Sequence, residues 1–328
     1  MFETKAEILE ALEMPDDRFR AECMGRAKQI WRDRGDELIG MAMLGYSNVC
    51  RNQCLYCGMR AANTAVRRFR LMPEEALELV KAAGRKGFGR LFLIAGEDPG
   101  YGFERLLELV EGAVRLGFRL SLACGEFEPA QYRELAAAGA REYVLKFEMS
   151  DPAEFDRLNP STTFQKRMAA IEAVRASGME LASGNIIGYP GHTPDQMAED
   201  ILLMKRLEIS WAPVVPYMPA VHTPLALEGG RGDVELALRE IAILRILMPG
   251  INITAGQPGR DLAKGFADEE GNLNALQAGA NLLFADLLPA AQAREFHVID
   301  DRIVLGLEHM RRMAERAGMR LRLDRGEE

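Results

Sequence analysis

Short apolar runs alternate with longer amphipathic stretches along most of this chain. From about residue 38 onward, Gly or Ala-Gly commonly closes an amphipathic stretch just before the next apolar run. Alternating strands and helices imply parallel strands joined by crossovers, and runs rich in Val, Ile and Leu suit a sheet covered on both faces. The apolar runs are "ELIGMAMLGY", "RLFLIAGE", "FRLSLACGE", "EYVLKFEM", "ELASGNIIGY", "WAPVVPYMP", "INITAG" and "ANLLFADL".

Eight such runs predict an α/β fold, a closed (βα)8 barrel of the TIM type, with an open doubly wound sheet as the alternative. No low-complexity linker interrupts the pattern, so we expect one domain over 1–328. Its parts are N-terminal capping helices (1–36), the barrel (37–290) and a C-terminal helix region (291–328). In that last region the run "RRMAERAGMRLRLDR" predicts a solvated helical face. Such barrels carry their chemistry at the carboxyl ends of the strands.

Composition narrows the class of protein. The chain has 328 residues, 48% of them hydrophobic, and its net charge of −8 argues against a nucleic-acid-binding surface. No apolar run reaches the roughly 18–20 residues that span a membrane. The acidic, amphipathic N-terminus is unlike a secretory signal. We therefore expect a cytoplasmic protein with neither a nucleic acid nor a membrane as a partner.

Three of the five cysteines, Cys50, Cys54 and Cys57, fall within eight residues directly after the first apolar run. This crowding favours reduced thiols that serve a metal over a disulfide framework. A structural zinc site needs a further pair of ligands, and none of the four histidines forms one. A redox CxxC made of Cys54 and Cys57 would leave Cys50 unexplained. Three ligands indicate a metal centre that keeps one position free, whereas Cys23 is expected to be a core residue.

The CxxxCxxC spacing, with Tyr56 just before the last cysteine, resembles the radical S-adenosylmethionine superfamily. The resemblance implies a 4Fe–4S cluster held by the three cysteines with one iron open, and Tyr56 beside the cofactor. S-adenosylmethionine would chelate that iron, receive an electron and give a 5′-deoxyadenosyl radical. An electron donor such as flavodoxin or ferredoxin is implied as a partner.

Further segments carry the same resemblance. In "IAGEDPG", Gly96 would let the backbone approach closely and Glu97 would accept from the methionine ammonium, although Ala95 stands where a glycine is usual. In "GNIIG", Ile186 would cover the adenine. "TFQKRM" matches an aromatic-x-x-Arg motif of the biotin synthase branch, where Arg167 would bind the methionine carboxylate, with a surface arginine as the plainer alternative. Glu148, at the end of the fourth run, is a candidate for the ribose hydroxyls.

Across nearly its whole length the sequence resembles the HydE-type maturases of FeFe-hydrogenase. The similar segments include "SNVCRNQCLYCGMR", "FRLMPEEAL", "TFQKRM", "GNIIGYPGHT" and "RILMPGINI". The resemblance implies radical chemistry on a small-molecule substrate, amino-acid-like or iron–cysteine, during assembly of the hydrogenase cofactor. The chain departs from that pattern in "LKFE", where Lys146 and Phe147 replace an expected Arg-His, and in "ITAGQPG" and "FADLLP".

Three other functions stay open. The chain resembles methylornithine synthase, a carbon-skeleton mutase, and biotin synthase, which needs extra cysteines for an auxiliary cluster where this chain offers only Cys124. A non-catalytic iron–sulfur scaffold is the third. For an enzyme, we expect Arg60 to anchor a substrate carboxylate and Lys146 to add a second positive group. Phe147 and Leu287 are expected to make the rest of the wall apolar.

Overall fold

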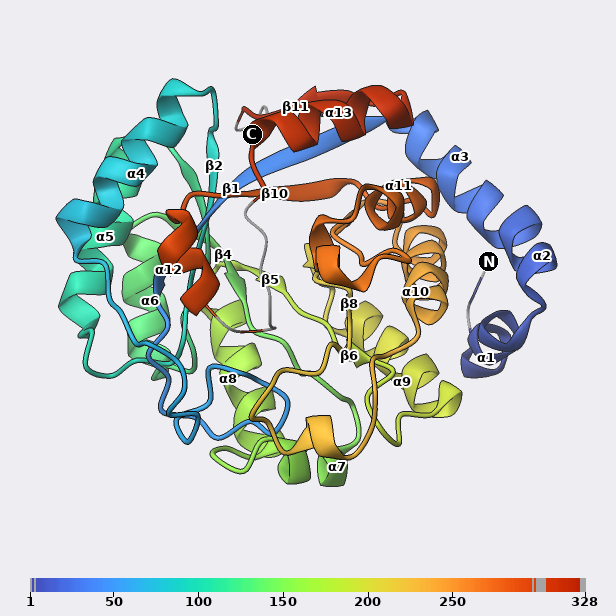
Figure 1. Ribbon diagram of the computed structural model, residues 1–328, viewed down its shortest axis with the longest axis horizontal. Coiled ribbons are helices and arrows are strands. Elements are labelled where there is room, and N and C mark those ends of the chain that lie inside the picture. The colour runs from blue at the N-terminus through green and yellow to red at the C-terminus, as the bar shows by residue number, and fades with distance from the viewer. Residues whose placement is uncertain (1, 3, 297, 299–304, 325–328) are drawn as a thin grey trace.

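The computed structural model describes every residue except 1, 3, 297, 299–304 and 325–328. Within the described residues, eight parallel strands form the barrel wall in the order β10-β1-β2-β3-β4-β5-β7-β9, and helices lie around them (Figure 1). These strands are β1 (Glu37–Ser47), β2 (Arg90–Ala95), β3 (Arg119–Ala123), β4 (Ala140–Val144), β5 (Glu180–Ala182), β7 (Trp211–Ala212), β9 (Asn252–Ile253) and β10 (Leu282–Asp286). Each overlaps one of the eight apolar runs.

The two ends of this strand order meet, which closes the barrel. Thr254, just after β9, forms a parallel bridge with Leu282 of β10. The Asn281 amide donates to the Ile253 carbonyl at 3.0 Å, and the Ala255 amide donates to the Leu282 carbonyl at 2.8 Å. An open doubly wound sheet would leave two unpaired edges, so the predicted (βα)8 barrel is confirmed.

Most of the outer helices end near a glycine, as the sequence predicts. For example, α4 has Pro73 in its first turn and ends just before Gly87, whose φ of +92° suits a glycine after a helix. The outer helices are α4 (Pro73–Arg85), α5 (Phe103–Arg115), α6 (Pro129–Ala137), α7 (Pro152–Leu158), α8 (Phe164–Ala176), α9 (Pro194–Arg206), α10 (Val234–Leu247) and α11 (Glu269–Gln277). Short helical turns lie at η2 (Leu225–Leu227) and η3 (Leu262–Ala267), and β6 (Ile186–Ile187) pairs with β8 (Val215–Pro216).

The N-terminal helices pack against α9, α10 and α11. They are α1 (Lys5–Glu13), α2 (Asp16–Phe19), η1 (Arg20–Met24) and α3 (Gly25–Asp33). The fully buried Arg245 of α10 lies 4.2 Å from the ring of Trp31, which also donates from Nε1 to the Glu37 carbonyl at the start of β1. These helices therefore anchor the amino end of the first strand.

The C-terminal region differs from its prediction. After α12 (Ala290–Glu295) and α13 (Leu307–Ala317), a strand β11 (Arg320–Arg322) pairs with the amino end of β1. The prediction of a continuous helical face was wrong here, because the helix ends at Gly318 in a left-handed conformation. Arg320 and Arg322 then pair with Glu37 while Leu321 packs on the core.

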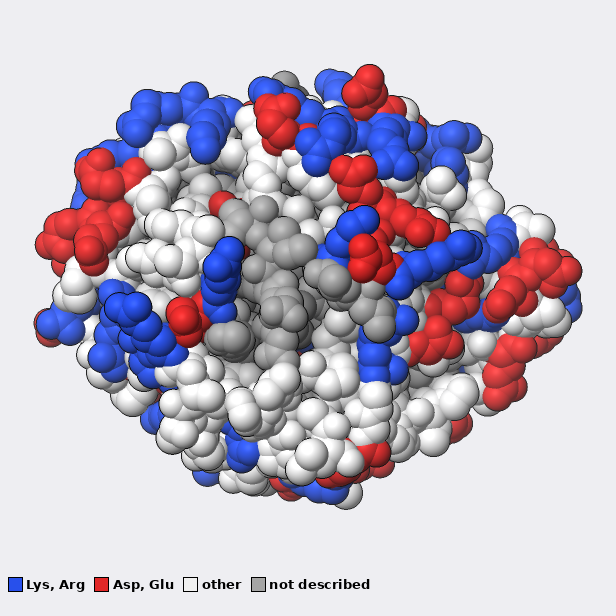
Figure 2. Space-filling view, viewed as in Figure 1, with Lys and Arg blue, Asp and Glu red and all other residues white. Residues whose placement is uncertain are grey.

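Charges of both signs are mixed around the edge of the face seen in Figure 2. Many of them form surface ion pairs, such as those of Arg312 and Arg316 with Glu269 at 3.0 and 2.6 Å. Across the described part of the chain, every helix is too short or too polar to span a membrane.

Candidate cofactor and substrate site

A cavity of about 490 Å³ opens among the carboxyl ends of the barrel strands. Its described lining is mostly apolar and includes charged side chains from the segment after β4, from α8 and from β10. These charged side chains are Lys146, Glu148, Arg167 and Asp286. The cavity lies at the end of the barrel where such folds carry their chemistry. We therefore take it as the place where cofactor and substrate meet.

The three-cysteine loop follows β1 and lies against the end of β2. The Arg51 amide donates to the Glu97 carbonyl at 2.9 Å. A Cβ added at Gly96 would lie 2.3 Å from the Val49 carbonyl oxygen and 2.8 Å from the Cys50 Cβ. Only glycine fits such an approach, so the predicted importance of Gly96 has a steric basis at the cysteine loop itself.

A single arginine holds the two ends of this loop together. Arg68 Nη1 donates to the carbonyls of Asn48 and Met59 at 2.6 and 2.8 Å. Its Nη2 donates to the carbonyls of Arg60 and Asn63 at 2.7 and 3.1 Å. Four contacts from one planar group to backbone before and after the cysteines fix the shape of the loop.

The three thiols of the loop are free and partly buried. Burial raises the pKa of Cys54 to about 12, and the neighbouring Cys50 adds to the rise. Burial and the nearby Cys54 also raise the pKa of Cys57. Three gathered thiolates thus need a cationic partner, and sulfur donors suit iron–sulfur clusters.

Among the described residues, no three acidic, histidine or cysteine side chains are arranged to hold one metal ion. A cluster binds each thiolate through a different iron, so its cysteines need not meet at one point. The donor set of the loop therefore fits a cluster better than a single ion.

Glu97 is held firmly beside the loop. Its carboxylate accepts from Arg51 Nε at 2.7 Å and from Asn52 Nδ2 at 3.1 Å. It also accepts from the Glu126 amide at 3.0 Å, and a Cβ at Gly125 would lie 2.3 Å from its Cγ. Glu97 therefore has a fixed position from which it can accept a further hydrogen bond.

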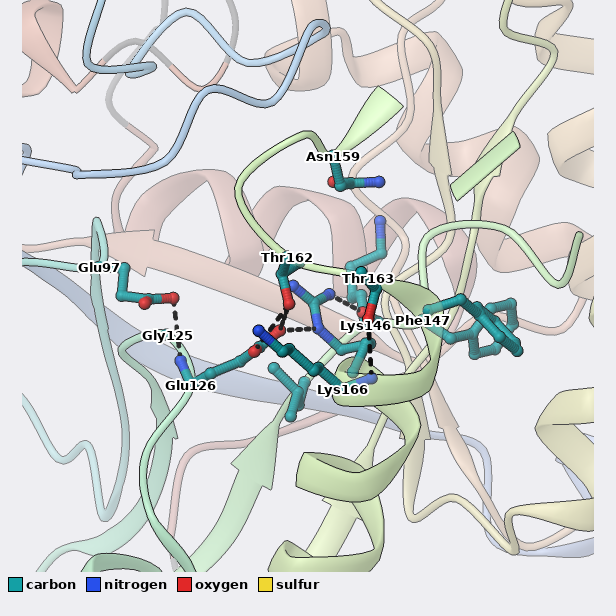
Figure 3. A network of polar contacts seen from close by, with 12 residues as sticks. Glu97, Gly125, Glu126, Lys146, Phe147, Asn159, Thr162, Thr163 and Lys166 are labelled. Carbon is teal, nitrogen blue, oxygen red and sulfur yellow. Dashed lines mark hydrogen bonds and ion pairs between the residues drawn. The ribbon is translucent and has the colours of Figure 1, made fainter. Parts of the chain in front are cut away.

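Arg167 is buried in the first turn of α8, so the alternative of a surface arginine was wrong. Its Nε donates to Glu126 at 2.6 Å, and its Nη1 donates to the Lys146 carbonyl. Figure 3 shows Glu126 between Glu97 and Thr162. The Thr162 hydroxyl also donates to the Glu126 carboxylate, at 3.2 Å.

Glu126 was missed in the sequence analysis. The signal was present, because Gly125-Glu126 after β3 repeats the Gly96-Glu97 pair after β2. Both glutamates now lie in one polar network that includes Arg167.

Glu148 and Ile186 lie side by side on the cavity wall. The Ile186 amide donates to the Glu148 carbonyl at 2.8 Å, and the Glu148 amide donates to the Gly184 carbonyl at 3.0 Å. Glu148 has a φ of +62°, and its Oε2 lies 2.9 Å from Lys146 Nζ. A carboxylate and an ammonium thus face the cavity as a pair.

The other predicted residues are placed as follows. Tyr56 lines the cavity and donates to Asn159 Oδ1 at 2.7 Å. Arg60 is partly buried but does not belong to the described lining, and its Nε has no hydrogen-bond partner among the described residues. The prediction that Phe147 and Leu287 form the apolar wall was wrong, because neither lines the cavity and Phe147 is fully buried in the main core.

Comparison with known proteins agrees with this site. Residues 45–204, which span the cysteine loop through α8 and most of α9, match the Radical SAM superfamily. The chain is 32% identical to the [FeFe] hydrogenase maturase subunit HydE of Thermotoga maritima over 92% of this chain and 85% of that protein. It is 30% identical to the biotin synthase of a Synechococcus species over 72% of this chain and 71% of that one.

The fold has the same relatives. The crystal structure of methylornithine synthase (PylB) superposes on this chain with a TM-score of 0.85 at 24% identity. The superposition covers 97% of this chain and 94% of the methylornithine synthase chain. Members of this superfamily use a 4Fe–4S cluster and S-adenosylmethionine, act on small molecules and need a reductant. Together, the cysteine loop at the carboxyl end of the barrel and the match over that region show that this chain is an enzyme of the radical S-adenosylmethionine superfamily.

Proposed function

We propose that this chain is a HydE-like enzyme that acts on a small amino-acid-like or iron–cysteine substrate in the maturation of FeFe-hydrogenase. The observation that carries the proposal is the 32% identity to a HydE maturase over 92% of the chain. The cavity at the strand ends supports it, because its volume of about 490 Å³ suits small molecules.

In this proposal Cys50, Cys54 and Cys57 hold the cluster and leave one iron open. When bound, the cluster supplies the electron that cleaves S-adenosylmethionine. The loop that carries the thiols is closed by Arg68 and lies against Gly96, so its shape is set by protein contacts. The reductant is an external carrier such as flavodoxin or ferredoxin.

The residues around Glu97 and Arg167 bind S-adenosylmethionine. Glu97 accepts from the methionine ammonium, and Arg167 donates to the carboxylate from Nη2, which makes no hydrogen bond within the described residues. Tyr56, Glu148 and Ile186 line the same cavity and suit the nucleoside end, which needs both polar and apolar contacts.

Formation of 5′-deoxyadenosine tests the cofactor roles proposed for these residues. Under anaerobic conditions, the reconstituted protein with dithionite and S-adenosylmethionine is expected to release it. The HydE-like assignment is tested by expression in hydrogenase-producing cells that lack their own HydE. Restored hydrogenase activity would support it, whereas cleavage without restoration would leave only the radical chemistry.

Lys146 and Phe147, which follow β4, depart from the maturase pattern, and this departure leaves the methylornithine-synthase-like alternative open. The biotin-synthase-like alternative is not supported by Cys124. Ala123 and Gly125 line the cavity, so the side chain between them points away from it, and Cys124 is buried in the main core.

Arg68→Lys is expected to weaken cluster binding without unfolding the protein. A lysine ammonium keeps the charge but cannot reach four carbonyls in a fixed plane. Reconstituted iron is expected to fall by about half or more, while the thermal midpoint of the cluster-free protein changes little. Arg70→Lys, at a nearby arginine that pairs with Asp98 instead, is the control. Equal iron content in wild type and Arg68→Lys would remove Arg68 from this role.

A further inference from the structure

The interior of the barrel contains an aromatic floor, which we define as Phe92, Trp211 and Phe284. These residues come from β2, β7 and β10, and all three line the cavity. Their ring centroids are 5.5 to 5.8 Å apart in pairs, so the rings touch one another. They belong to an apolar cluster separate from the main core. The end of the cavity opposite its mouth is therefore closed by a continuous apolar surface.

A hydrogen bond on the side away from the cavity fixes the orientation of Trp211 in this floor. Its Nε1 donates to the buried Glu142 at 2.5 Å, and Glu142 also accepts from Ser121 Oγ at 2.6 Å and from Ser210 Oγ. Glu142 itself does not line the cavity. Its oxygens are thus occupied by donors behind the floor and offer no anion to a ligand above it.

The charged lining residues lie at the opposite end of the cavity. Lys146 and Glu148 follow Val144, the last residue of β4, by two and four positions. Asp286 follows Phe284 by two positions on β10. At about 3.3 Å per strand residue, Asp286 lies roughly 7 Å beyond Phe284 along β10, whereas Lys146 and Glu148 lie past the carboxyl end of β4. The cavity is therefore polar at its mouth and apolar at its floor.

We infer that the substrate is a small α-amino acid with an uncharged, apolar side chain. This inference rests on the proposed function and narrows its substrate class. Lys146 binds the carboxylate and Asp286 binds the ammonium, while the side chain lies on the aromatic floor. A charged side chain would lose its hydration on the floor and find no partner among the described residues there.

The test compares L-norleucine with L-lysine, which share one carbon chain and differ by the terminal ammonium. Binding is measured by equilibrium titration of the cluster-loaded protein with S-adenosylmethionine and no reductant. Norleucine is expected to bind at least tenfold more tightly than lysine. From L-alanine through L-norvaline to L-norleucine, each added methylene is expected to improve affinity about fourfold.

Phe284→Asp places an anion on the floor and is expected to reverse the preference, so that lysine binds more tightly than norleucine. Phe284→Asn, of the same size without the charge, is the matched control and is expected to keep norleucine ahead. S-adenosylmethionine affinity and iron content report whether each variant is folded. If Phe284→Asp fails to fold, the wild-type ratio and the Asn variant still decide.

Equal binding of norleucine and lysine to wild type would overturn the inference, as would no binding of either while S-adenosylmethionine is bound and cleaved. The latter result leaves the proposed radical function intact. Tighter binding of norleucine than of lysine, together with no formation of 5′-deoxyadenosine when a reductant is added, would support the binding of an apolar side chain on the floor but would contradict the proposed function. The two failures are therefore distinguishable.

Discussion

Cys54→Ala is expected to lose nearly all the iron that the reconstituted wild-type protein binds, about four per chain for a 4Fe–4S cluster. The three cysteines of the loop provide the only closely spaced thiols in the sequence. Removing one leaves two thiolates, which cannot hold a cluster that already lacks a fourth protein ligand. Iron analysis and the electron paramagnetic resonance signal of the reduced protein measure the effect, and 5′-deoxyadenosine formation is expected to fall to background.

Cys124→Ala is the matched control. Burial raises the pKa of the Cys124 thiol to about 12, as it does for Cys54, so both thiols resist ionisation in the cluster-free protein. Cys124 lies outside the loop and should leave the iron content unchanged. Full iron in Cys54→Ala, or loss of iron in Cys124→Ala, would contradict the ligand assignment.

The barrel could be predicted from sequence because its strands are short apolar runs and its helices end at glycines. The strand pattern failed where a run divides into two short strands, as the fifth and sixth runs do. The fifth run, 180–189, reads as one strand, but it divides into β5 and β6 at Gly184. There its backbone pairs with Glu148 instead of continuing along the barrel wall. β11 was not predicted, because its two arginines look in the sequence like part of a solvated helical face. In the structure both arginines pair with Glu37.

The candidate site was predictable in part, for a related reason. Cys50, Gly96 and Arg167 stand in recognisable motifs near strand ends. The aromatic floor does not, because parallel barrel strands are apolar on both faces and sequence alone does not say which side chains point inward. Phe147 shows the difficulty. It is next to Lys146 and Glu148 in sequence, yet its side chain is buried in the main core while theirs face the cavity.

Arg167→Ala is expected to weaken S-adenosylmethionine binding ten- to a hundredfold, which corresponds to about 1.5–3 kcal/mol for a lost charge-assisted contact. The side chain is buried, donates to Glu126 at 2.6 Å and lies 5.3 Å from the Phe155 ring. Its removal also leaves Glu126 without its cation beside the expected methionine site, which adds repulsion toward a carboxylate. Equilibrium titration of the reconstituted variant measures the affinity.

Two further variants separate binding from folding. Arg175 lies on the same helix and pairs with Glu172 and Glu208 at the surface, so Arg175→Ala is expected to bind S-adenosylmethionine like wild type. Arg167→Lys keeps a cation near Glu126 but loses the planar fork, so its affinity should lie between those of wild type and Arg167→Ala. The iron content of both Arg167 variants is measured before titration. A variant that has lost its structure is expected to bind less iron, so affinities are compared only between proteins of equal iron content. A folded, fully loaded Arg167→Ala that binds S-adenosylmethionine as tightly as Arg175→Ala would show that Arg167 serves only to hold Glu126 and the end of β4.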